Sequence, residues 1–263
     1  MKATDPIAAS QQWVAIIPAR YASTRFPGKP LAKIQGKSMI ERVYLQARQV
    51  MEEVWVATDD QRIAGEVKRF GGRCAITSAD HSSGTDRVRE ALDYVEQQTG
   101  KNFHMVANVQ GDEPFIQPGQ LRELMGCFAD AHTQIATLIK SIDQNNDLFN
   151  ENIPKVVTNH QSYALYFSRS PIPFVRNCQK DHWNEHFPFM KHIGLYAYRA
   201  DVLRQITHLA PSTLEMAESL EQNRWIQNGF RIKTATTQYE NYPVDTPADL
   251  EAIGQHMDEK SND

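Results

Sequence analysis

Basic residues gather in one short stretch near the amino terminus, Ile16–Pro30, which reads IIPARYASTRFPGKP. Arg20, Arg25 and Lys29 lie within ten positions of one another there, and no acidic residue occurs from position 6 to position 40. Cations and backbone N–H groups that converge after the first strand of a sheet can bind a polyphosphate. The stretch therefore predicts a polyphosphate site. The alternative is a surface loop that is basic without a ligand.

A second candidate for chemistry is Asp112, within the segment Gln110–Pro114. Gly111 and Pro114 are typical of a tight turn, which would fix the direction of the carboxylate. Mg²⁺ prefers carboxylate, water and phosphate oxygens, so a basic loop and a turn-held aspartate predict metal-assisted phosphoryl or nucleotidyl transfer. The alternative for a single aspartate after a strand, and for Asp245 late in the chain, is a charge at a helix N-terminus.

Familiar nucleotide and catalytic patterns do not occur in the sequence. Gly36-Lys37-Ser38 resembles the end of a Walker A loop, but Leu31 stands where that loop requires glycine. No G-x-G-x-x-G follows the first apolar run, and neither H-E-x-x-H nor G-x-S-x-G is found. The nine histidines form no metal-binding spacing. The basic stretch is therefore expected to hold phosphate in another way.

Apolar runs and helical repeats alternate along the first half of the chain, which predicts an α/β fold with a doubly wound, mainly parallel sheet. Strands are predicted at Trp13–Ile17, Val54–Ala57, Cys74–Ile76, Met105–Val109 and Ile135–Ile142. Helices are predicted at Ser38–Val50, Ile63–Phe70, Gly84–Gly100 and from Pro118. Parallel strands bring their carboxyl ends to one crevice, so the polar residues that follow them should converge. These residues are Arg20, Ser23, Arg25, Lys29, Asp59, Asp60, Asp80, His81, Ser82, Ser83, Gly84 and Asp112.

The pattern changes after about Asp143. Strands without clear helices between them are predicted at Val156-Val157, Tyr163–Phe167 and Ile193–Tyr198. The proline- and aromatic-rich loop before the last of these strands is expected to cover substrate, to form a subunit interface, or simply to pack on itself. The closing elements are predicted as one capped helix from Ser212 to Gly229, a strand at Ile232–Ala235 and a capped helix from Thr246.

The composition is that of an ordinary globular protein: 263 residues, 41% hydrophobic and 23% charged. A net charge of −4 gives no reason to expect nucleic acid or an anionic membrane as a partner, and no apolar run could span a bilayer. The three scattered cysteines are consistent with a reducing cytoplasm. Residues 1–12 are expected to be a flexible leader, residues 13–257 a single domain and residues 258–263 a tail.

Seven segments occur in the order IIPARYASTRFPGKPL, TSADHSSGTDR, VANVQGDEP, YALYFSR, HIGLYAYR, LEQ and VDTPADL. Together they resemble the 3-deoxy-manno-octulosonate cytidylyltransferases, also called CMP-Kdo synthetases. The matching blocks run from about residue 13 to residue 256. The opening block is shared by related sugar nucleotidyltransferases, whereas YFSR, HIGLYAYR and LEQ are more specific.

The resemblance implies a cytoplasmic homodimer with a Rossmann-like sheet of nucleotidyltransferase type. A mixed-strand segment, at about residues 155–200, would be inserted for substrate binding and dimerisation. The implied reaction is CTP plus 3-deoxy-D-manno-octulosonate (Kdo) giving CMP-Kdo and pyrophosphate, with Mg²⁺, for lipopolysaccharide biosynthesis. The expected mechanism is in-line attack of the anomeric hydroxyl on the α-phosphorus, with the protein positioning the groups and stabilising charge.

The resemblance also implies roles for individual residues. Arg20, Lys29, Asp112 and Asp245 would be catalytic, and the two aspartates would hold the metal. The nucleotide contacts would be Ala19, Arg20, Ser23, Thr24, Lys29, Asp80, Ser82, Gly84 and Arg87. The sugar-acid contacts would be Gln110, Arg169, His192, Tyr196, Glu221 and Gln222. A planar guanidinium suits a carboxylate, although the alternative for Arg169 is a structural ion pair.

Two other functions stay open from the sequence. One is nucleotidyl transfer to another sugar, such as sialic acid or a phosphosugar. The other is a glycosyltransferase on a similar fold, with Asp112 as its metal anchor, which would transfer a sugar without releasing pyrophosphate. A pyrophosphate-release assay across several nucleotides and sugar acids separates the three.

Overall fold

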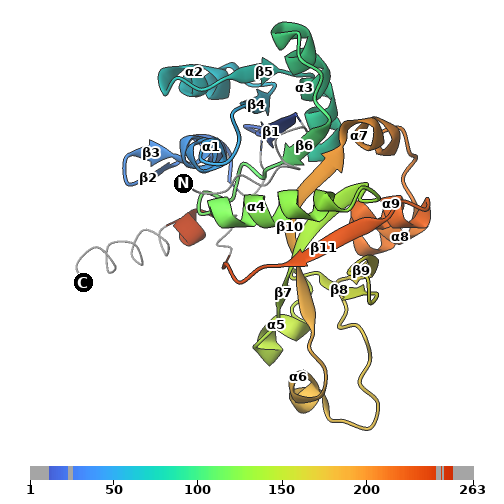
Figure 1. Cartoon of the computed structure of the whole chain (residues 1–263). Coiled ribbons are helices and arrows are strands. Elements are labelled where there is room, and N and C mark those ends of the chain that lie inside the picture. The colour runs from blue at the N-terminus through green and yellow to red at the C-terminus, as the bar shows by residue number, and fades with distance from the viewer. Residues whose placement is uncertain (1–11, 23–25, 241–243, 245, 251–263) are drawn as a thin grey trace, which may run out of the picture. The chain divides into compact units, whose positions relative to one another are not determined.

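The computed structural model describes residues 12–22, 26–240, 244 and 246–250 (Figure 1). The chain folds as two compact units, the first formed by residues 1–121 and 239–263 and the second by residues 122–238. Each unit is described by itself below. The prediction of one domain over residues 13–257 stays a prediction.

A parallel sheet is the core of the first unit. β1 (Trp13–Pro18) lies between β6 (Met105–Asn108) and β4 (Val54–Thr58), and β5 (Cys74–Ile76) pairs with the outer side of β4. Almost every residue of β1, β4 and β6 is buried, as expected for parallel strands covered on both faces. The parallel sheet predicted from the alternating pattern is confirmed in this unit.

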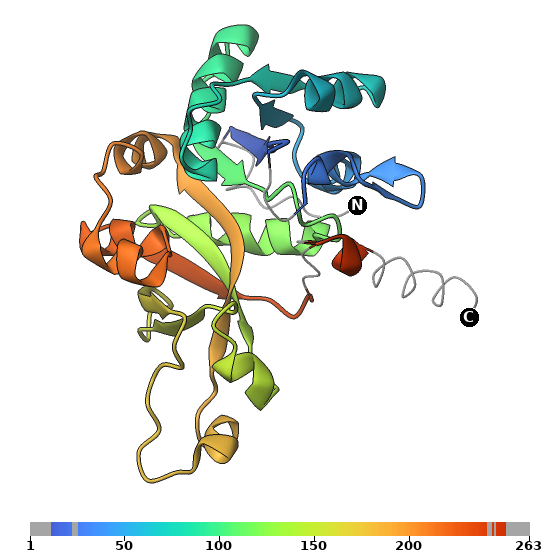
Figure 2. The ribbon, with the colours of Figure 1, turned by 180° about the vertical axis from the view of Figure 1, so that it is seen from behind.

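Helices surround this sheet in the order that the sequence predicts (Figures 1 and 2). They are α1 (Met39–Arg48), α2 (Gln61–Arg69) and α3 (Gly84–Thr99). α4 (Pro118–Gly126) contains the boundary between the two units. The Ser38 hydroxyl accepts from the Glu41 N–H at the start of α1, and Gly100, in the left-handed region, ends α3. A hairpin that the sequence did not predict, β2 (Lys33–Ile34) with β3 (Lys37–Ser38), precedes α1.

The second unit contains a mixed sheet. β7 (Ile135–Ser141) pairs antiparallel with β10 (Met190–Arg199) and parallel with β11 (Ile232–Thr236). β8 (Lys155–Thr158) pairs antiparallel with both β10 and β9 (Ala164–Ser168). The mixed strands predicted after Asp143 are therefore confirmed.

One helix prediction in this unit is wrong. The single helix from Ser212 to Gly229 is two short helices, α8 (Thr213–Glu218) and α9 (Gln222–Gln227). Ser219 has a φ of 50° and ends α8 with a left-handed residue. Asn223 then exchanges two hydrogen bonds with the backbone of Phe167 in β9. This contact with a distant strand fixes the start of α9. The sequence also did not predict α5 (Asn145–Phe149) or α7 (Ala200–Ile206).

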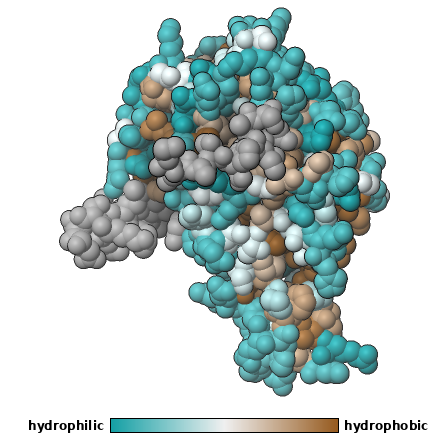
Figure 3. Space-filling model, viewed as in Figure 1, coloured by the Kyte–Doolittle hydropathy of each residue, from teal (hydrophilic) through white to brown (hydrophobic). Residues whose placement is uncertain are grey.

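The aromatic segment before β10 packs largely on itself. It carries η3 (Lys180–His182) and α6 (Trp183–His186). Trp183 is buried against Phe189, with Phe149 and Phe174 at its edges. Phe174 is nevertheless 72% exposed, and Figure 3 shows hydrophobic residues at the surface near α5 and α6. Trp183 thus packs within its own segment, as one of the alternatives expected. Phe174, in contrast, exposes an apolar side chain to solvent.

Candidate active site

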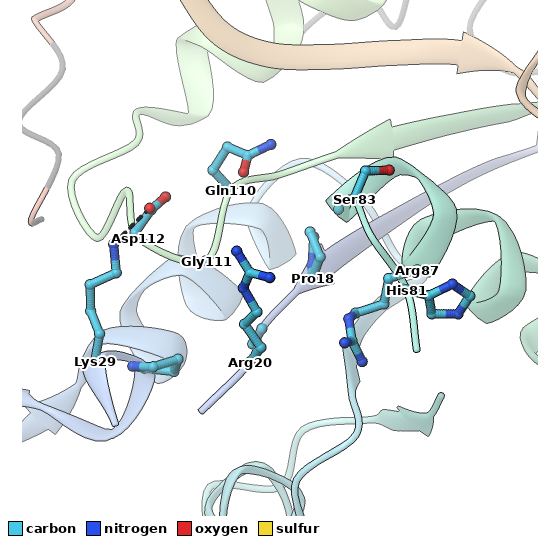
Figure 4. Close-up of a pocket in the computed structure, with 12 residues that line it drawn as sticks. Pro18, Arg20, Lys29, His81, Ser83, Arg87, Gln110, Gly111 and Asp112 are labelled. Carbon is cyan, nitrogen blue, oxygen red and sulfur yellow. Dashed lines mark hydrogen bonds and ion pairs between the residues drawn. The ribbon is translucent and has the colours of Figure 1, made fainter. Parts of the chain in front are cut away.

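A cavity of about 250 Å³ in the first unit brings together residues from four segments of the chain (Figure 4). These segments are the end of β1, the 3₁₀ helix η1 (Lys29–Leu31), the start of α3 and the turn after β6. The lining residues are Pro18, Ala19, Arg20, Lys29, Pro30, His81, Ser83, Gly84, Arg87, Gln110, Gly111 and Asp112. Nine of the residues predicted from the sequence therefore share one cavity: Ala19, Arg20, Lys29, His81, Ser83, Gly84, Arg87, Gln110 and Asp112.

The basic loop leaves β1 directly into this cavity. Ala19 continues the sheet by donating its N–H to the carbonyl of Ala57 at 2.9 Å, and the exposed Arg20 side chain extends into the cavity in Figure 4. Gly28 returns the chain, with its N–H 2.9 Å from the carbonyl of Tyr21 and a φ of 73°. A Cβ at Gly28 would also come within 3.0 Å of the Tyr21 ring, so glycine is required for this return. Lys29 follows at the start of η1.

Lys29 and Asp112 form an ion pair across the cavity, with 2.8 Å between Nζ and Oδ2 (Figure 4). The Lys29 side chain is only 13% exposed, whereas that of Asp112 is 36% exposed. The sequence assigns these two residues separate roles, one toward phosphate and one toward metal. Without ligands, the two charges neutralise each other.

The turn that carries Asp112 is held tightly against the end of β1. A Cβ placed on Gly111 would lie 2.8 Å from the carbonyl oxygen of Pro18, closer than side chains approach backbone atoms. The Glu113 N–H donates to the carbonyl of Gln110 at 3.3 Å and closes the turn. The tight turn predicted from Gly111 and Pro114 is confirmed, and it fixes the backbone beneath the Asp112 carboxylate.

The start of α3 forms the opposite wall. The Ser83 hydroxyl caps the helix by accepting from the Asp86 N–H at 3.1 Å. Arg87, one turn later, is buried and donates to the Thr77 hydroxyl at 2.6 Å. Its guanidinium also lies 2.9 Å from Asp59 Oδ1. Arg87 therefore brings a positive charge to the cavity from a fixed position.

The loop before α3 is shaped by Glu90. Its carboxylate accepts from the Ser78 N–H, at 3.0 Å to one oxygen, and pairs with His81 Nε2. Burial raises the pKa of Glu90, but the hydrogen bonds from His81 and Ser78 outweigh it and lower the pKa overall. Glu90 thus stays ionised and holds the loop that lines the cavity.

The loop before α3 carries four residues of interest, and only some of them line the cavity; the nucleotide roles of Asp80 and Ser82 stay predictions. Asp80 and Ser82 are not among the described lining residues, whereas His81 and Ser83 between them are. Ser82 donates to Asp86 at 3.1 Å, and Asp80 interacts with Ser78. Ser83 is among the residues expected to converge, and its position before a helical repeat is also a helix-cap signal. A strand end alone does not tell which side chains of the following loop face the cavity.

Asp60 has the structural role that was the alternative for an aspartate after a strand, namely a charge at a helix N-terminus. Its carboxylate caps α2 by accepting from the Arg62 N–H at 2.8 Å. The side-chain hydrogen bond from Arg62 lowers its pKa. Asp60 is therefore a helix cap.

The predicted sugar-acid contacts other than Gln110 lie in the second unit. Arg169 follows β9, and its guanidinium donates to the carbonyls of Glu218 at 2.7 Å and Glu151 at 2.9 Å. Its own N–H donates to the Glu218 carboxylate at 2.9 Å. Arg169 thus connects the end of α8 to the loop at Glu151, which is a structural role. Its positive charge also suits an anion.

His192 and Tyr196 lie together on β10, with 5.3 Å between their ring centroids. His192 Nε2 is 3.1 Å from the Thr137 hydroxyl. Loss of water around the imidazole lowers the pKa of His192 to about 3, so the ring is neutral near pH 7. Burial raises the pKa of Tyr196 well above its usual value, with a smaller contribution from the neighbouring charge of Glu221. Both rings therefore act as neutral hydrogen-bonding groups.

Glu221 and Gln222 stand at the start of α9, directly after the break that Ser219 makes. Gln222 is buried, and its Nε2 has no hydrogen-bond partner among the described residues. A buried amide without a partner is costly, so a ligand hydroxyl would satisfy it. Trp225, also on α9, packs edge-on against Tyr196 at 5.3 Å and connects this corner to His192 and Tyr196.

Four predicted residues, Ser23, Thr24, Arg25 and Asp245, lie outside the described residues. Within the described ranges no group of three or more His, Cys, Asp or Glu side chains could hold a metal ion. Mg²⁺ usually takes only one or two protein carboxylates and completes its shell with water and phosphate. The partly exposed carboxylate of Asp112 fits such a site. No helix in the described part of the chain is long and apolar enough to cross a membrane.

Comparisons with known proteins identify the family of this chain. A family model described as Cytidylyltransferase matches residues 14–233. The chain is 54% identical over 244 residues to a 3-deoxy-manno-octulosonate cytidylyltransferase of Parabacteroides distasonis, covering 91% of this chain and 96% of that protein. It is 51% identical over 253 residues to one of Bacteroides thetaiotaomicron, covering 95% and 100%. The resemblance predicted from the sequence is confirmed.

Solved structures extend the comparison. A structure of CMP:2-keto-3-deoxy-manno-octonic acid synthetase complexed with CTP has a TM-score of 0.86 and 43% identity, covering 95% of this chain and 100% of that one. A 4-diphosphocytidyl-2C-methyl-D-erythritolsynthase from Anaerococcus prevotii shares the fold at a TM-score of 0.61 and 11% identity, covering 97% of this chain and 100% of that one. The predicted α/β fold of nucleotidyltransferase type is confirmed.

Proposed function

Because the chain belongs to the 3-deoxy-manno-octulosonate cytidylyltransferase family, we propose that it couples CTP to Kdo and releases pyrophosphate. The observation that carries this proposal is the convergence of Arg20, Lys29, Arg87 and Asp112 on one cavity. Three cations suit a triphosphate, and the carboxylate suits the metal that accompanies it. The product, CMP-Kdo, would serve lipopolysaccharide biosynthesis.

The transfer is a displacement at the α-phosphorus of CTP. The anomeric oxygen of Kdo forms the new bond to phosphorus, the α–β bridging bond breaks, and its electron pair leaves with pyrophosphate. The hydroxyl proton passes to solvent. Arg20 and Lys29 stabilise the charge that develops on the leaving group, and the fixed cavity walls align the reacting atoms. No covalent intermediate with the protein is required.

Asp112 and Asp245 would hold a divalent cation, which we propose to be Mg²⁺. When bound, such an ion favours ionisation of the attacking hydroxyl and offsets phosphate charge. The turn at Gly111 supports this assignment because it holds the Asp112 backbone against Pro18. The role of Asp245 rests on the family resemblance.

The family resemblance assigns the recognition of Kdo to Gln110, Arg169, His192, Tyr196, Glu221 and Gln222. The Arg169 guanidinium would attract the carboxylate of the sugar acid. Neutral His192 and Tyr196, with Glu221 and Gln222, would contact the hydroxyl groups. The chemistry of these side chains matches a polyhydroxylated acid. The nucleotide roles of Ala19, Ser23, Thr24, Asp80, Ser82 and Gly84 rest on the family resemblance, and among them Asp80 and Ser82 have the least support from the described cavity.

We further propose that the enzyme works in the cytoplasm as a homodimer. Exposed Phe174 and the surrounding aromatic segment support a subunit interface, since apolar side chains of this size favour burial against a partner. The inserted segment at about residues 155–200 would provide both this interface and part of the sugar-acid site. Analytical ultracentrifugation tests the dimer.

The direct test is a pyrophosphate-release assay with the purified chain, CTP, Kdo and Mg²⁺. We expect release with CTP and Kdo together and with neither alone. CTP should be preferred over UTP, ATP and GTP, and Kdo over sialic acid. Turnover only with another sugar acid or an amino-Kdo would overturn the substrate assignment. Sugar transfer from a nucleoside diphosphate sugar without pyrophosphate would indicate a glycosyltransferase.

A further inference from the structure

We propose that Lys29 competes with the divalent cation for the Asp112 carboxylate and releases this carboxylate when nucleotide phosphates bind the lysine. This inference rests on the proposed function, in which Asp112 is a metal ligand. Its starting point is the 2.8 Å ion pair between Lys29 Nζ and Asp112 Oδ2. An ammonium group at that distance stands where a cation would have to approach the same oxygen. Lys29 and the metal therefore repel each other when both lie against the Asp112 carboxylate.

The ion pair differs from an ordinary surface pair because the lysine is mostly shielded from water. The Lys29 side chain is 13% exposed, and the next residue, Pro30, is buried. Charges that are shielded from solvent interact more strongly than exposed ones. A cation that displaces Lys29 from Asp112 takes one close anion away from an ammonium group that is mostly shielded from water. In the absence of nucleotide, the protein should therefore bind divalent cations weakly.

The geometry decides which partner moves. Gly111 is pressed against the carbonyl of Pro18, so the turn that carries Asp112 has little room to withdraw. The backbone of Lys29 is also fixed, since its N–H donates to the Phe26 carbonyl at 3.2 Å and its carbonyl accepts from Ala32. The flexible part is the four-carbon side chain of the lysine. Exchange therefore consists of Lys29 Nζ leaving Asp112 for another anion in the cavity.

The cavity offers a place for that anion. Arg20 extends into the same space, and Arg87 contributes charge from the opposite wall (Figure 4). A triphosphate bound between these cations would bring oxygens within reach of Lys29. It would also carry the metal that replaces the lysine at Asp112. Lys29 would thus favour a nucleotide that arrives with its metal over the metal alone.

The test is a titration of the protein with Mn²⁺, followed by electron paramagnetic resonance of the free ion. Without nucleotide, we expect Lys29→Met to bind Mn²⁺ about fivefold more tightly than the unchanged protein. That change corresponds to about 1 kcal/mol, the size of a good ion pair. Lys37→Met removes the same charge from the exposed strand β3 and should leave Mn²⁺ affinity within twofold. The double variant Lys29→Met with Asp112→Asn should not show the increase in Mn²⁺ affinity that Lys29→Met shows alone.

Saturating CTP should reverse the order of the Mn²⁺ affinities of the two proteins. With CTP and no Kdo, we expect the unchanged protein to bind Mn²⁺ more tightly than Lys29→Met, because Lys29 then holds the phosphates. Lys29→Gln serves as a second variant and should behave as Lys29→Met does. Circular dichroism confirms that each variant is folded.

Equal Mn²⁺ affinity of the unchanged protein and Lys29→Met without nucleotide would overturn the proposal, and so would the absence of measurable binding to both. Tighter binding by Lys29→Met that persists in the Asp112→Asn background would also overturn it, since the gain would then not involve Asp112. The titration needs no turnover. A failed pyrophosphate assay would therefore count against the proposed function. The competition at Asp112 would still be decided by the Mn²⁺ titration alone.

Discussion

Arg87 Nη1 lies 2.6 Å from the Thr77 hydroxyl and 2.9 Å from Asp59 Oδ1, so one buried guanidinium joins α3 to the ends of β4 and β5. These strands are neighbours in the sheet, and the Thr77 N–H also donates to the carbonyl of Thr58 at 3.0 Å. Arg87 therefore serves both the framework of the cavity and its charge.

Replacing Arg87 by Met should lower the free energy of unfolding by about 2 kcal/mol, because Thr77 and Asp59 lose a partner within a largely buried site. It should also raise the KM for CTP. Arg89→Met is the matched control, since Arg89 lies on the same helix and its pair with Asp93 is longer, at 3.5 Å, and more exposed. Urea unfolding and steady-state kinetics measure the two effects. Equal losses in both variants would show that Arg87 has no special role.

Asp112→Asn should reduce kcat by about 100-fold or more, since the amide cannot replace a carboxylate in charge stabilisation around the metal. The fold should be preserved because the side chain is partly exposed. Glu113→Gln makes the same chemical change at the next residue of the turn and should retain most activity. The pyrophosphate assay compares the three proteins. Similar rates in all of them would refute the assignment of Asp112.

Gly111→Ala should displace the turn from Pro18, because the added Cβ would lie 2.8 Å from a backbone oxygen. We expect a loss of about 1–3 kcal/mol in stability, the usual range for overpacking, and a lower kcat through the shifted Asp112. Gly65→Ala adds the same methyl group on α2, where nothing lies within 4 Å. It should instead stabilise the protein by about 0.5–1 kcal/mol. Thermal unfolding distinguishes the opposite signs.

The lowered pKa of His192, about 3, makes the stability of the protein depend on pH. In the unfolded chain the imidazole would titrate near pH ~6.5. Between these values the unfolded state binds more protons, so this contribution is complete above about pH 6.5 and is lost as the pH falls. When the pH falls from about 7 to about 5, the free energy of unfolding should decrease in both proteins. The decrease should be smaller in His192→Asn than in the unchanged protein, by up to about 2 kcal/mol.

Urea unfolding at the two pH values measures this difference, and His160→Asn, at an exposed position of the same unit, is the control. An unchanged pH dependence in His192→Asn would mean that the ring takes up its proton over the same pH range in the folded and unfolded protein. That result would also remove the argument for a neutral hydrogen-bonding group at this position.

Much of the first unit could be predicted from the sequence because its signals are local. Cys74–Ile76 is a strand as predicted, and α3 runs from Gly84 to a stop at Gly100. Parallel strands then bring their following loops together as a matter of topology, so that Arg20, Lys29 and Asp112 could be expected to meet.

The features that the sequence did not predict depend on contacts between distant residues. Lys29 and Asp112 pair across 83 positions, and neither residue type indicates that they neutralise each other. The break between α8 and α9 depends on Asn223 binding the backbone of Phe167, 56 positions away, while the helical repeat itself continues through the break. Side-chain facing in the loop before α3 was likewise decided by Glu90, which holds Ser78 and His81.

The position of β1 between two parallel strands has a consequence for hydrogen exchange. Val14–Ile17 are buried, and the strand is bonded to β4 on one side and β6 on the other. Amides in such a strand exchange with deuterium only when the surrounding unit unfolds, whereas amides of η1, held by single turn bonds, exchange through local opening. The amides of Val14–Ile17 should therefore stay protected as long as the unit is folded, while those of η1 should exchange earlier.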